Sequence, residues 1–150
     1  MIADESRPIL IVEDSDDDFE ATVRALGKDK PIRNRVVRCE NGGDAMRYLY
    51  SKTGAAVTDP KQRPGLVLLD LNMPGFDGRN LLAVMRKEKS TKTLPVVILT
   101  TSDDEMDIKQ CYEMGANTYI KKPVELEKLN EAFRCLKEYW FEFAVIPKFN

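Results

Sequence analysis

The distribution of apolar and polar residues along the chain predicts alternating strands and helices. Five apolar runs are short enough to be buried strands, at residues 9–12, 36–39, 66–69, 95–99 and 118–120. In the segments that follow them, apolar residues recur every three or four positions, as at Phe19, Val23 and Leu26, which is typical of an amphipathic helix. We therefore expect a strand followed by a helix, five times over.

Strands that are apolar throughout and alternate with helices are typical of a parallel sheet with helices on both faces. Helix-capping residues precede four of the helical segments: Ser15, Asn41, Asp77, and Ser102 with Glu105 in a capping box. The connection at residues 52–65 is long and polar, so we expect a surface loop there. The predicted architecture is an α/β protein with a doubly wound parallel sheet.

Composition narrows the class of protein. With 150 residues, 43% of them hydrophobic, the chain can bury one full core, and a net charge of -2 offers no general attraction to nucleic acid. The absence of histidine excludes a Ser/His/Asp triad, a His-ligated zinc site and a phosphohistidine on this chain. The three cysteines lack metal-binding spacing, and no apolar stretch is long enough to span a membrane. We therefore expect a cytoplasmic protein with reduced thiols and no membrane contact.

Polar residues follow the apolar strands abruptly, and parallel strands bring such residues to one edge of the sheet. Glu13 and Asp14 follow the first strand, Asp70 the third, Thr100 the fourth and Lys122 the fifth. Three carboxylates repel one another unless a cation lies among them, and oxygen ligands suit Mg²⁺ or Mn²⁺. A lysine and a hydroxyl at the same edge can stabilise an incoming phosphoryl group, so the pattern predicts phosphoryl transfer onto a carboxylate.

Four motifs carry a resemblance to a known family. They are ILIVEDS at 9–15, LDLNMPGFDG at 69–78, PVVILTTS at 95–102 and YIKKP at 119–123. In this order they resemble the receiver domain of two-component response regulators, over about residues 8–138. The resemblance implies a flavodoxin-like fold of five strands and five helices with strand order 2-1-3-4-5.

The resemblance also implies a role for each residue at the sheet edge. Asp70 resembles the phosphoacceptor, and Glu13 and Asp14 resemble the acidic pair that holds Mg²⁺ together with Asp70 and the backbone carbonyl of Asn72. Thr100 resembles the switch hydroxyl, and Lys122 resembles the lysine that pairs with the phosphoryl oxygens. Phosphorylation is then expected to change a protein-binding surface.

Four further positions follow from the same resemblance. Tyr119 resembles the aromatic residue whose rotamer follows Thr100, and Pro123 is expected to follow a cis peptide bond. Asn72 and Ser102 flank the path of attacking water and are expected to tune how long the phosphoryl group survives. On this basis the chain is not an enzyme with an external substrate, because it catalyses only its own phosphorylation and dephosphorylation.

The last residues are unusually aromatic. We expect a receiver domain over 1–138 and an extension over 139–150 that serves as a dimerisation arm, since such clusters mark interfaces. The alternative is that the extension packs onto its own domain. The residues expected to make the dimer contact are Tyr139, Trp140, Phe141, Phe143, Val145 and Ile146. The extension and the long loop are similar to those of single-domain regulators paired with bacterial phytochromes. The expected partners are therefore a sensor histidine kinase, with a bacteriophytochrome as one candidate, a second copy of the chain and an unknown downstream protein, but no nucleic acid.

Three other functions compete with this interpretation. A haloacid dehalogenase-type phosphatase also uses an Asp at a strand end, but it needs a second Asp where this chain has Asn72. A flavodoxin-like electron carrier would place the FMN phosphate beside Glu13 and Asp14, which would repel it. A degenerate receiver that acts as a scaffold without phosphorylation stays open, although the acceptor, the acidic pair and the lysine are all present.

Overall fold

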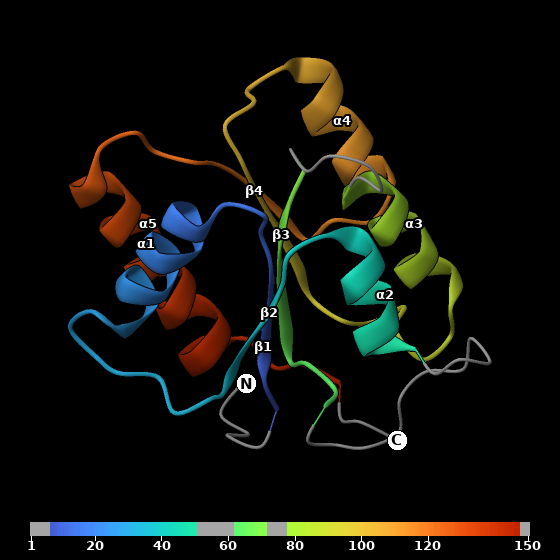
Figure 1. Ribbon diagram of the computed structural model, residues 1–150, viewed down its shortest axis with the longest axis horizontal. Helices are drawn as coiled ribbons and strands as arrows, with labels where there is room; N and C mark the ends of the chain where they lie inside the picture. The colour runs from blue at the N-terminus through green and yellow to red at the C-terminus, as the bar shows by residue number, and fades with distance from the viewer. Residues whose placement is uncertain (1–6, 51–61, 72–77, 148–150) are drawn as a thin grey trace.

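The computed structural model describes residues 7–50, 62–71 and 78–147, and these form a single parallel sheet covered by helices (Figure 1). The sheet has five strands in the order β2-β1-β3-β4-β5. The strands are β1 (Ile9–Val12), β2 (Val36–Cys39), β3 (Leu66–Asp70), β4 (Val96–Thr100) and β5 (Thr118–Lys121). The predicted fold class and strand order are confirmed.

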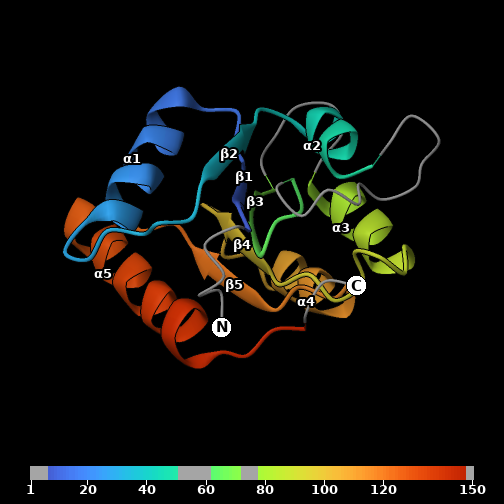
Figure 2. The ribbon, with the colours of Figure 1, turned by 90° about the horizontal axis from the view of Figure 1, so that it is seen from below.

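Each strand is followed by a helix, as the periodicity predicts. The helices are α1 (Asp16–Gly27), α2 (Gly42–Leu49), α3 (Gly78–Lys87), α4 (Glu105–Glu113) and α5 (Leu126–Lys137). Helices α1 and α5 cover one face of the sheet, and α2, α3 and α4 cover the other (Figure 2). None of the helices in the described ranges combines the length and the apolar character that a membrane span requires.

The core consists of two apolar layers, one on each face of the sheet. Along β1, Leu10 and Val12 belong to the layer under α2, α3 and α4, whereas Ile9 and Ile11 belong to the layer under α1 and α5. All four are at most 2% exposed, and Phe133 of α5 closes the second layer at 1%. Burial on both faces explains why β1, β3 and β4 are apolar almost throughout, whereas the edge strands β2 and β5 are only partly buried and include Arg38 and Lys121.

The helix starts agree with the predicted caps at two positions and differ at a third. The side chains of Ser15 and Asn41 accept hydrogen bonds from backbone N–H groups in the first turns of α1 and α2, as predicted. The predicted capping box at Ser102 is wrong. Helix α4 begins at Glu105, and its N-cap is Asp104, whose side chain accepts a hydrogen bond from the N–H of Met106. The predicted cap at Asp77 lies outside the described residues.

The chain continues beyond α5 as a short π-helix, η1 (Glu138–Phe143), and then crosses from the side of α5 toward the side of α3 and α4 (Figure 2). Trp140, Phe141 and Ile146 pack against the apolar layer under α1 and α5. Polar contacts are also made by the extension: Lys30 forms an ion pair with Glu142 of η1 at 2.7 Å, and Arg7 donates to the carbonyl of Pro147 at 3.3 Å. The extension is therefore folded partly onto its own domain.

The outward side of the extension differs from its inward side. Tyr139, Phe143 and Val145 are 57%, 68% and 87% exposed. Half of the six residues expected to make a dimer contact are therefore available at the surface, and the other half contact their own chain.

Candidate functional site

Three carboxylates meet at the carboxyl end of the sheet. Strands β1 and β3 are neighbours, with Val12 paired to Leu69, so Glu13 and Asp70 follow side by side. The carboxylates of Glu13, Asp14 and Asp70 each offer one oxygen, and these oxygens all lie within 4.8 Å of one another. Glu13 and Asp70 are buried, while Asp14 is exposed and opens the cluster to solvent.

This cluster fits a small divalent cation. Oxygens that ligate one Mg²⁺ at about 2.1 Å lie at most about 4.2 Å apart, so only a small inward movement of the carboxylates is needed. Hard oxygen donors from three carboxylates, with one side open to water, are the set that Mg²⁺ and Mn²⁺ prefer. Glu13, Asp14 and Asp70 are therefore the residues that would hold the ion, whereas the predicted fourth ligand, the carbonyl of Asn72, lies outside the described residues.

Lys122 follows β5 and reaches into the same cluster. Its Nζ lies 2.6 Å from Glu13 Oε1, 3.1 Å from Asp70 Oδ2 and 3.3 Å from Asp18 Oδ2. The side chain is only 13% exposed, so these ion pairs are largely shielded from water. The single ammonium group thus offsets part of the negative charge of the acidic residues around it.

Burial and mutual repulsion govern the protonation of this group. Burial raises the pKa of Glu13 to about 7, and the hydrogen bond and negative charge of Asp70 add to this effect, while Lys122 opposes it. For Lys122, burial alone would lower the pKa, but the hydrogen bond to Glu13 and the charge of Asp70 raise it above its usual range. Without a divalent cation, Glu13 therefore keeps its proton to a higher pH than an ordinary glutamate, while Lys122 stays charged.

The predicted switch residues are linked to one another through the β4–α4 turn. Thr100 is fully buried at the end of β4, and its Oγ1 accepts a hydrogen bond from the N–H of Ser102 at 3.4 Å. The Tyr119 hydroxyl donates to the carbonyl of Ser102 at 2.8 Å, and the Ser102 hydroxyl donates to Asp107 at 2.7 Å. A movement of Thr100 would therefore disturb the same turn that holds Tyr119 and α4.

The expected cis peptide before Pro123 is wrong. The described residues, which include Lys122 and Pro123, contain no cis peptide bond. The trans form is the intrinsic preference of such bonds by about 0.5–1 kcal/mol, and Lys122 already reaches Glu13 and Asp70 from this backbone.

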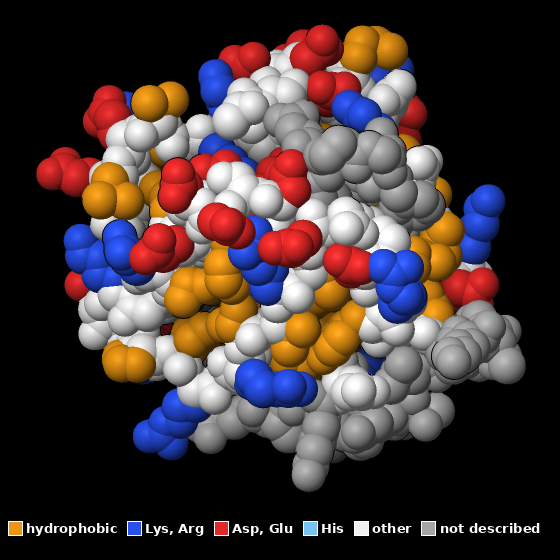
Figure 3. Space-filling view, in the orientation of Figure 1, with side chains coloured by type: hydrophobic (Ala, Val, Ile, Leu, Met, Phe, Trp, Pro, Cys, Tyr) orange, Lys and Arg blue, Asp and Glu red, His pale blue; other side chains and the backbone are white. Residues whose placement is uncertain are grey.

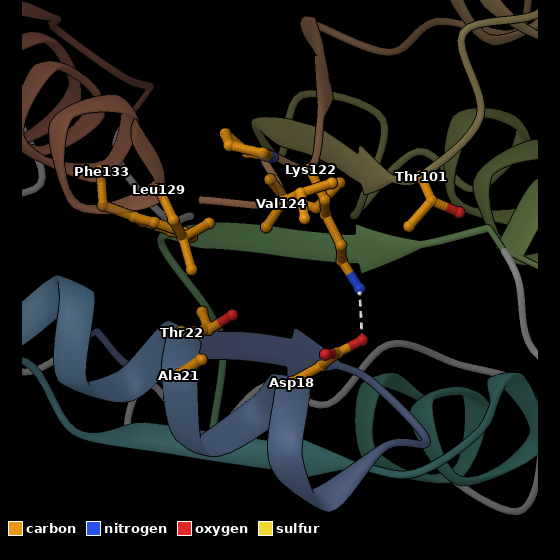
Figure 4. Close-up of a pocket in the computed structure, with 10 residues that line it drawn as sticks. Asp18, Ala21, Thr22, Thr101, Lys122, Val124, Leu129 and Phe133 are labelled. Carbon is orange, nitrogen blue, oxygen red and sulfur yellow. Dashed lines mark hydrogen bonds and ion pairs between the residues drawn. The ribbon is translucent and has the colours of Figure 1, made fainter. Parts of the chain in front are cut away.

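Sequence reasoning missed two residues that shape the site. Asp18 is an acidic residue in the first turn of α1, and its side chain forms an ion pair with Lys122 at the edge of the pocket (Figure 4). The sequence carries no signal for this pair, because acidic residues are common in the first turn of any helix. Gly78 packs under Asp70, where a Cβ would lie 2.6 Å from the Asp70 carbonyl oxygen.

A pocket of about 230 Å³ lies next to Lys122, between α1 and the segment that leads into α5 (Figure 4). Asp18 and Lys122 lie at its charged end, and Ala21, Leu129 and Phe133 line its apolar part. Acidic side chains gather over the upper half of this side of the molecule, where the strands end (Figure 3). The site is thus a negative surface around one buried lysine, with an apolar pocket beside it.

Comparison with known proteins agrees with this geometry. The model of the response regulator receiver domain matches residues 9–134. Response regulator Rcp1 of Synechocystis sp. is 36% identical over 149 residues, covering 97% of this chain and 99% of that protein.

Two solved structures are similar over 95% of this chain and 99% of theirs. The phosphorylated cyanobacterial phytochrome response regulator RcpA has a TM-score of 0.83 and 34% identity. The Mn²⁺-bound form of Rcp1 has a TM-score of 0.82 and 33% identity.

Proposed function

This chain belongs to the response regulator receiver family, and on that basis we propose that it is a single-domain regulator that accepts a phosphoryl group on Asp70. The observation that carries the proposal is the placement of Asp70. Its buried carboxylate lies among two further carboxylates and 3.1 Å from the Lys122 ammonium. A nucleophile, a cation-binding group and a fixed positive charge are the parts that phosphoryl transfer needs.

In the proposed reaction, a carboxylate oxygen of Asp70 attacks the phosphorus of the donor. The new O–P bond forms as the bond from phosphorus to the donor breaks, and the donor leaves with the bonding electrons. A bound Mg²⁺ or Mn²⁺ supplies positive charge that offsets the negative charge on the transferred oxygens. Lys122 would turn from Glu13 toward the phosphoryl group, and Thr100 would donate its hydroxyl to another phosphoryl oxygen.

The divalent cation is part of this proposal. The structure of a relative with Mn²⁺ bound supports a divalent ion, and the three carboxylates of this chain fit one. We propose Mg²⁺ as the working ion because it is the commoner partner of phosphoryl groups.

The donor is proposed to be a sensor histidine kinase, since this chain has no histidine of its own. The similarity to Rcp1 and RcpA, the latter a phytochrome response regulator, supports a bacteriophytochrome as one candidate kinase. The apolar pocket beside Lys122 offers the kinase a contact surface next to Asp70. Such a pairing implies a cytoplasmic location.

The proposed output is a change in protein binding rather than turnover of an external substrate. Phosphorylation would draw Thr100 inward. The hydrogen bonds that Ser102 accepts from Tyr119 and donates to Asp107 would carry the change to β5 and α4. The downstream protein would read that surface.

The acceptor role is tested by Asp70→Asn. Uptake of labelled phosphoryl from acetyl phosphate with Mg²⁺ should be fast for the natural chain and lost for the variant. Asp14→Asn is the matched comparison, because it removes one charge from the same cluster but leaves the acceptor, so its uptake should be slowed and restored by more Mg²⁺. Uptake by Asp70→Asn at the natural rate would refute the role. If the natural chain took up none, the phosphorylation-independent scaffold would be favoured.

We also propose that two copies associate through the outward side of the extension. Tyr139 and Phe143 of η1 and Val145 just beyond it are exposed apolar residues, and exposed apolar surface of this kind marks protein interfaces. Trp140, Phe141 and Ile146 support the contact from behind.

The test of self-association keeps the full chain, because removing the extension would uncover the apolar layer beneath it. Phe143→Glu should convert a dimer to a monomer in sedimentation velocity. Val124→Glu is the matched control, since Val124 is fully exposed on another surface, and it should leave the dimer intact. A natural chain that sediments as a monomer, phosphorylated or not, would refute the proposal.

A further inference from the structure

Arg38, near the end of β2, contacts the turn that carries two of the three clustered carboxylates. Its Nε donates to the backbone carbonyl of Glu13 at 3.1 Å, and its Nη1 forms an ion pair with Asp16 at 2.7 Å. The guanidinium also lies over the ring of Phe19, with Cζ 4.8 Å from the ring centroid. The side chain is only 20% exposed, so it is held on several sides.

These contacts complete the attachment of Glu13 to β2. The N–H of Glu13 donates to the carbonyl of Cys39 at 3.0 Å, which extends the β1–β2 ladder by one step. The carbonyl of Glu13 is then taken by the side chain of Arg38. Both peptide groups that flank the Glu13 side chain are therefore fixed, and so is the direction in which its carboxylate leaves the backbone.

Asp14 is held less directly than Glu13, because Arg38 does not touch it and the second ion pair of Arg38 is to the side chain of Asp16, which is 85% exposed. Asp14 lies between Glu13 and Asp16, and Arg38 holds both of these neighbours. A short turn that is fastened at both ends has little freedom to move the residue in the middle.

We infer that Arg38 is a positioning residue for the divalent-cation site: by fastening Glu13 and Asp16 to β2, it places the carboxylates of Glu13 and Asp14 for the ion. The inference rests on the proposed cation site but goes beyond the proposed function, which involves no residue of β2. Lysine could not do the same, because a single ammonium lacks the rigid fork that reaches two acceptors in fixed directions.

The inference is testable because the positive charge of Arg38 and its positioning role predict opposite effects on cation affinity when the residue is replaced. A positive charge beside an acidic site repels a cation, so on charge alone the loss of Arg38 should tighten cation binding. If Arg38 positions the ligands, its loss should weaken binding despite the lower repulsion. Residues that orient metal ligands typically account for about 10–100-fold in affinity.

The experiment measures Mn²⁺ affinity by titration calorimetry on the full chain, for the natural protein, Arg38→Lys and Arg38→Met. Arg24→Lys and Arg24→Met are matched controls, because Arg24 lies on α1 and is exposed, with an ion pair to Glu20. Thermal unfolding in a chelator checks that each variant is folded at the temperature of the titration. Should Arg38→Met fail to fold, the conservative Arg38→Lys carries the test.

We expect both Arg38 variants to bind Mn²⁺ about tenfold more weakly and both Arg24 variants to stay within about twofold of the natural chain. An Arg38→Lys variant that binds like the natural chain would overturn the inference, as would an Arg38→Met variant that binds more tightly. Lack of Mn²⁺ binding by the natural chain itself would overturn the proposed cation site as well. The two failures are thus distinguishable.

Discussion

Replacing Glu13 by glutamine should stabilise the protein when no divalent cation is present. Glu13 is buried next to Asp70, and the negative charge of both groups is offset only in part by Lys122. Glutamine has nearly the same shape but no charge, so Glu13→Gln removes the repulsion and the desolvation of the carboxylate. Glu13 would therefore lower the stability of the fold when no cation is bound, although it contributes to cation binding.

The size of the effect follows from the raised pKa of Glu13. The difference between its ordinary pKa of 4.5 and about 7 in the folded protein corresponds to about 3 kcal/mol of lost stability when the carboxylate is ionised. The pKa of Glu13 is higher in the folded chain than in the unfolded chain. The folded state therefore keeps its full stability below pH 4.5, where Glu13 is protonated in both states, and loses these roughly 3 kcal/mol as the pH rises through about 7. Glu13→Gln also removes the shortest ion pair of Lys122, and water reaches the cluster through Asp14, so about 1–2 kcal/mol of gain should remain above pH 7.

The assay is urea unfolding with a chelator at a pH above 7, repeated with excess Mg²⁺. Without the ion, Glu13→Gln should be more stable than the natural chain. With the ion, the natural chain should gain stability according to the ratio of ion concentration to Kd, while the variant gains much less. Glu20→Gln, which removes an exposed carboxylate from α1, is the matched control and should change neither result by more than about 0.5 kcal/mol.

A Glu13→Gln variant less stable than the natural chain in the chelator would refute this reasoning. That result would mean that the ion pair with Lys122 outweighs the burial of the carboxylate. An equal gain in stability from Mg²⁺ in both proteins would instead show that Glu13 is not a ligand of the cation.

Three further results are expected. Phe133→Ala should cost about 3–5 kcal/mol in urea unfolding, since the ring is fully buried, whereas Leu126→Ala, at an exposed position at the start of the same helix, should cost less than about 1 kcal/mol. Lys122→Ala should tighten Mn²⁺ binding, because a competing cation is removed, yet slow phosphoryl uptake by about 10²–10³-fold; slower uptake with unchanged binding would contradict the competition. The hydrogen bond from Ser102 holds the pKa of Asp107 below its usual range. The stability that this bond contributes should therefore be complete above the ordinary pKa of 3.8 and be lost only at lower pH, and an NMR titration that gives Asp107 an ordinary pKa would contradict the bond.

The sheet and its edge could be predicted because their signals are local. The central strands are short apolar runs, and the chemical groups lie at or just after the strand ends, so Glu13, Asp70 and Lys122 could be placed from strand ends alone. Parallel topology then brings them together without any knowledge of the loops.

Other features depend on the tertiary environment and could not be predicted. Asp18 looks like any acidic residue in a first helical turn, and only the path of the Lys122 side chain gives it a partner. Ser102 has the pattern of a cap, and its hydroxyl does accept a hydrogen bond from the N–H of Asp104 at 3.2 Å, but α4 begins only at Glu105 and Asp104 is its N-cap. The direction of Trp140 depends on the turn from α5 into η1, which the three-four spacing does not specify.

The central claim is that this chain carries a phosphoryl group on Asp70 with the help of a divalent cation. Treatment of the natural chain with acetyl phosphate and Mg²⁺, followed by rapid digestion and mass spectrometry, tests it most directly. We predict a gain of one phosphoryl group on the peptide that contains Asp70, and its loss when a chelator replaces Mg²⁺. A phosphoryl group on another peptide, or uptake that does not depend on the cation, would contradict the claim.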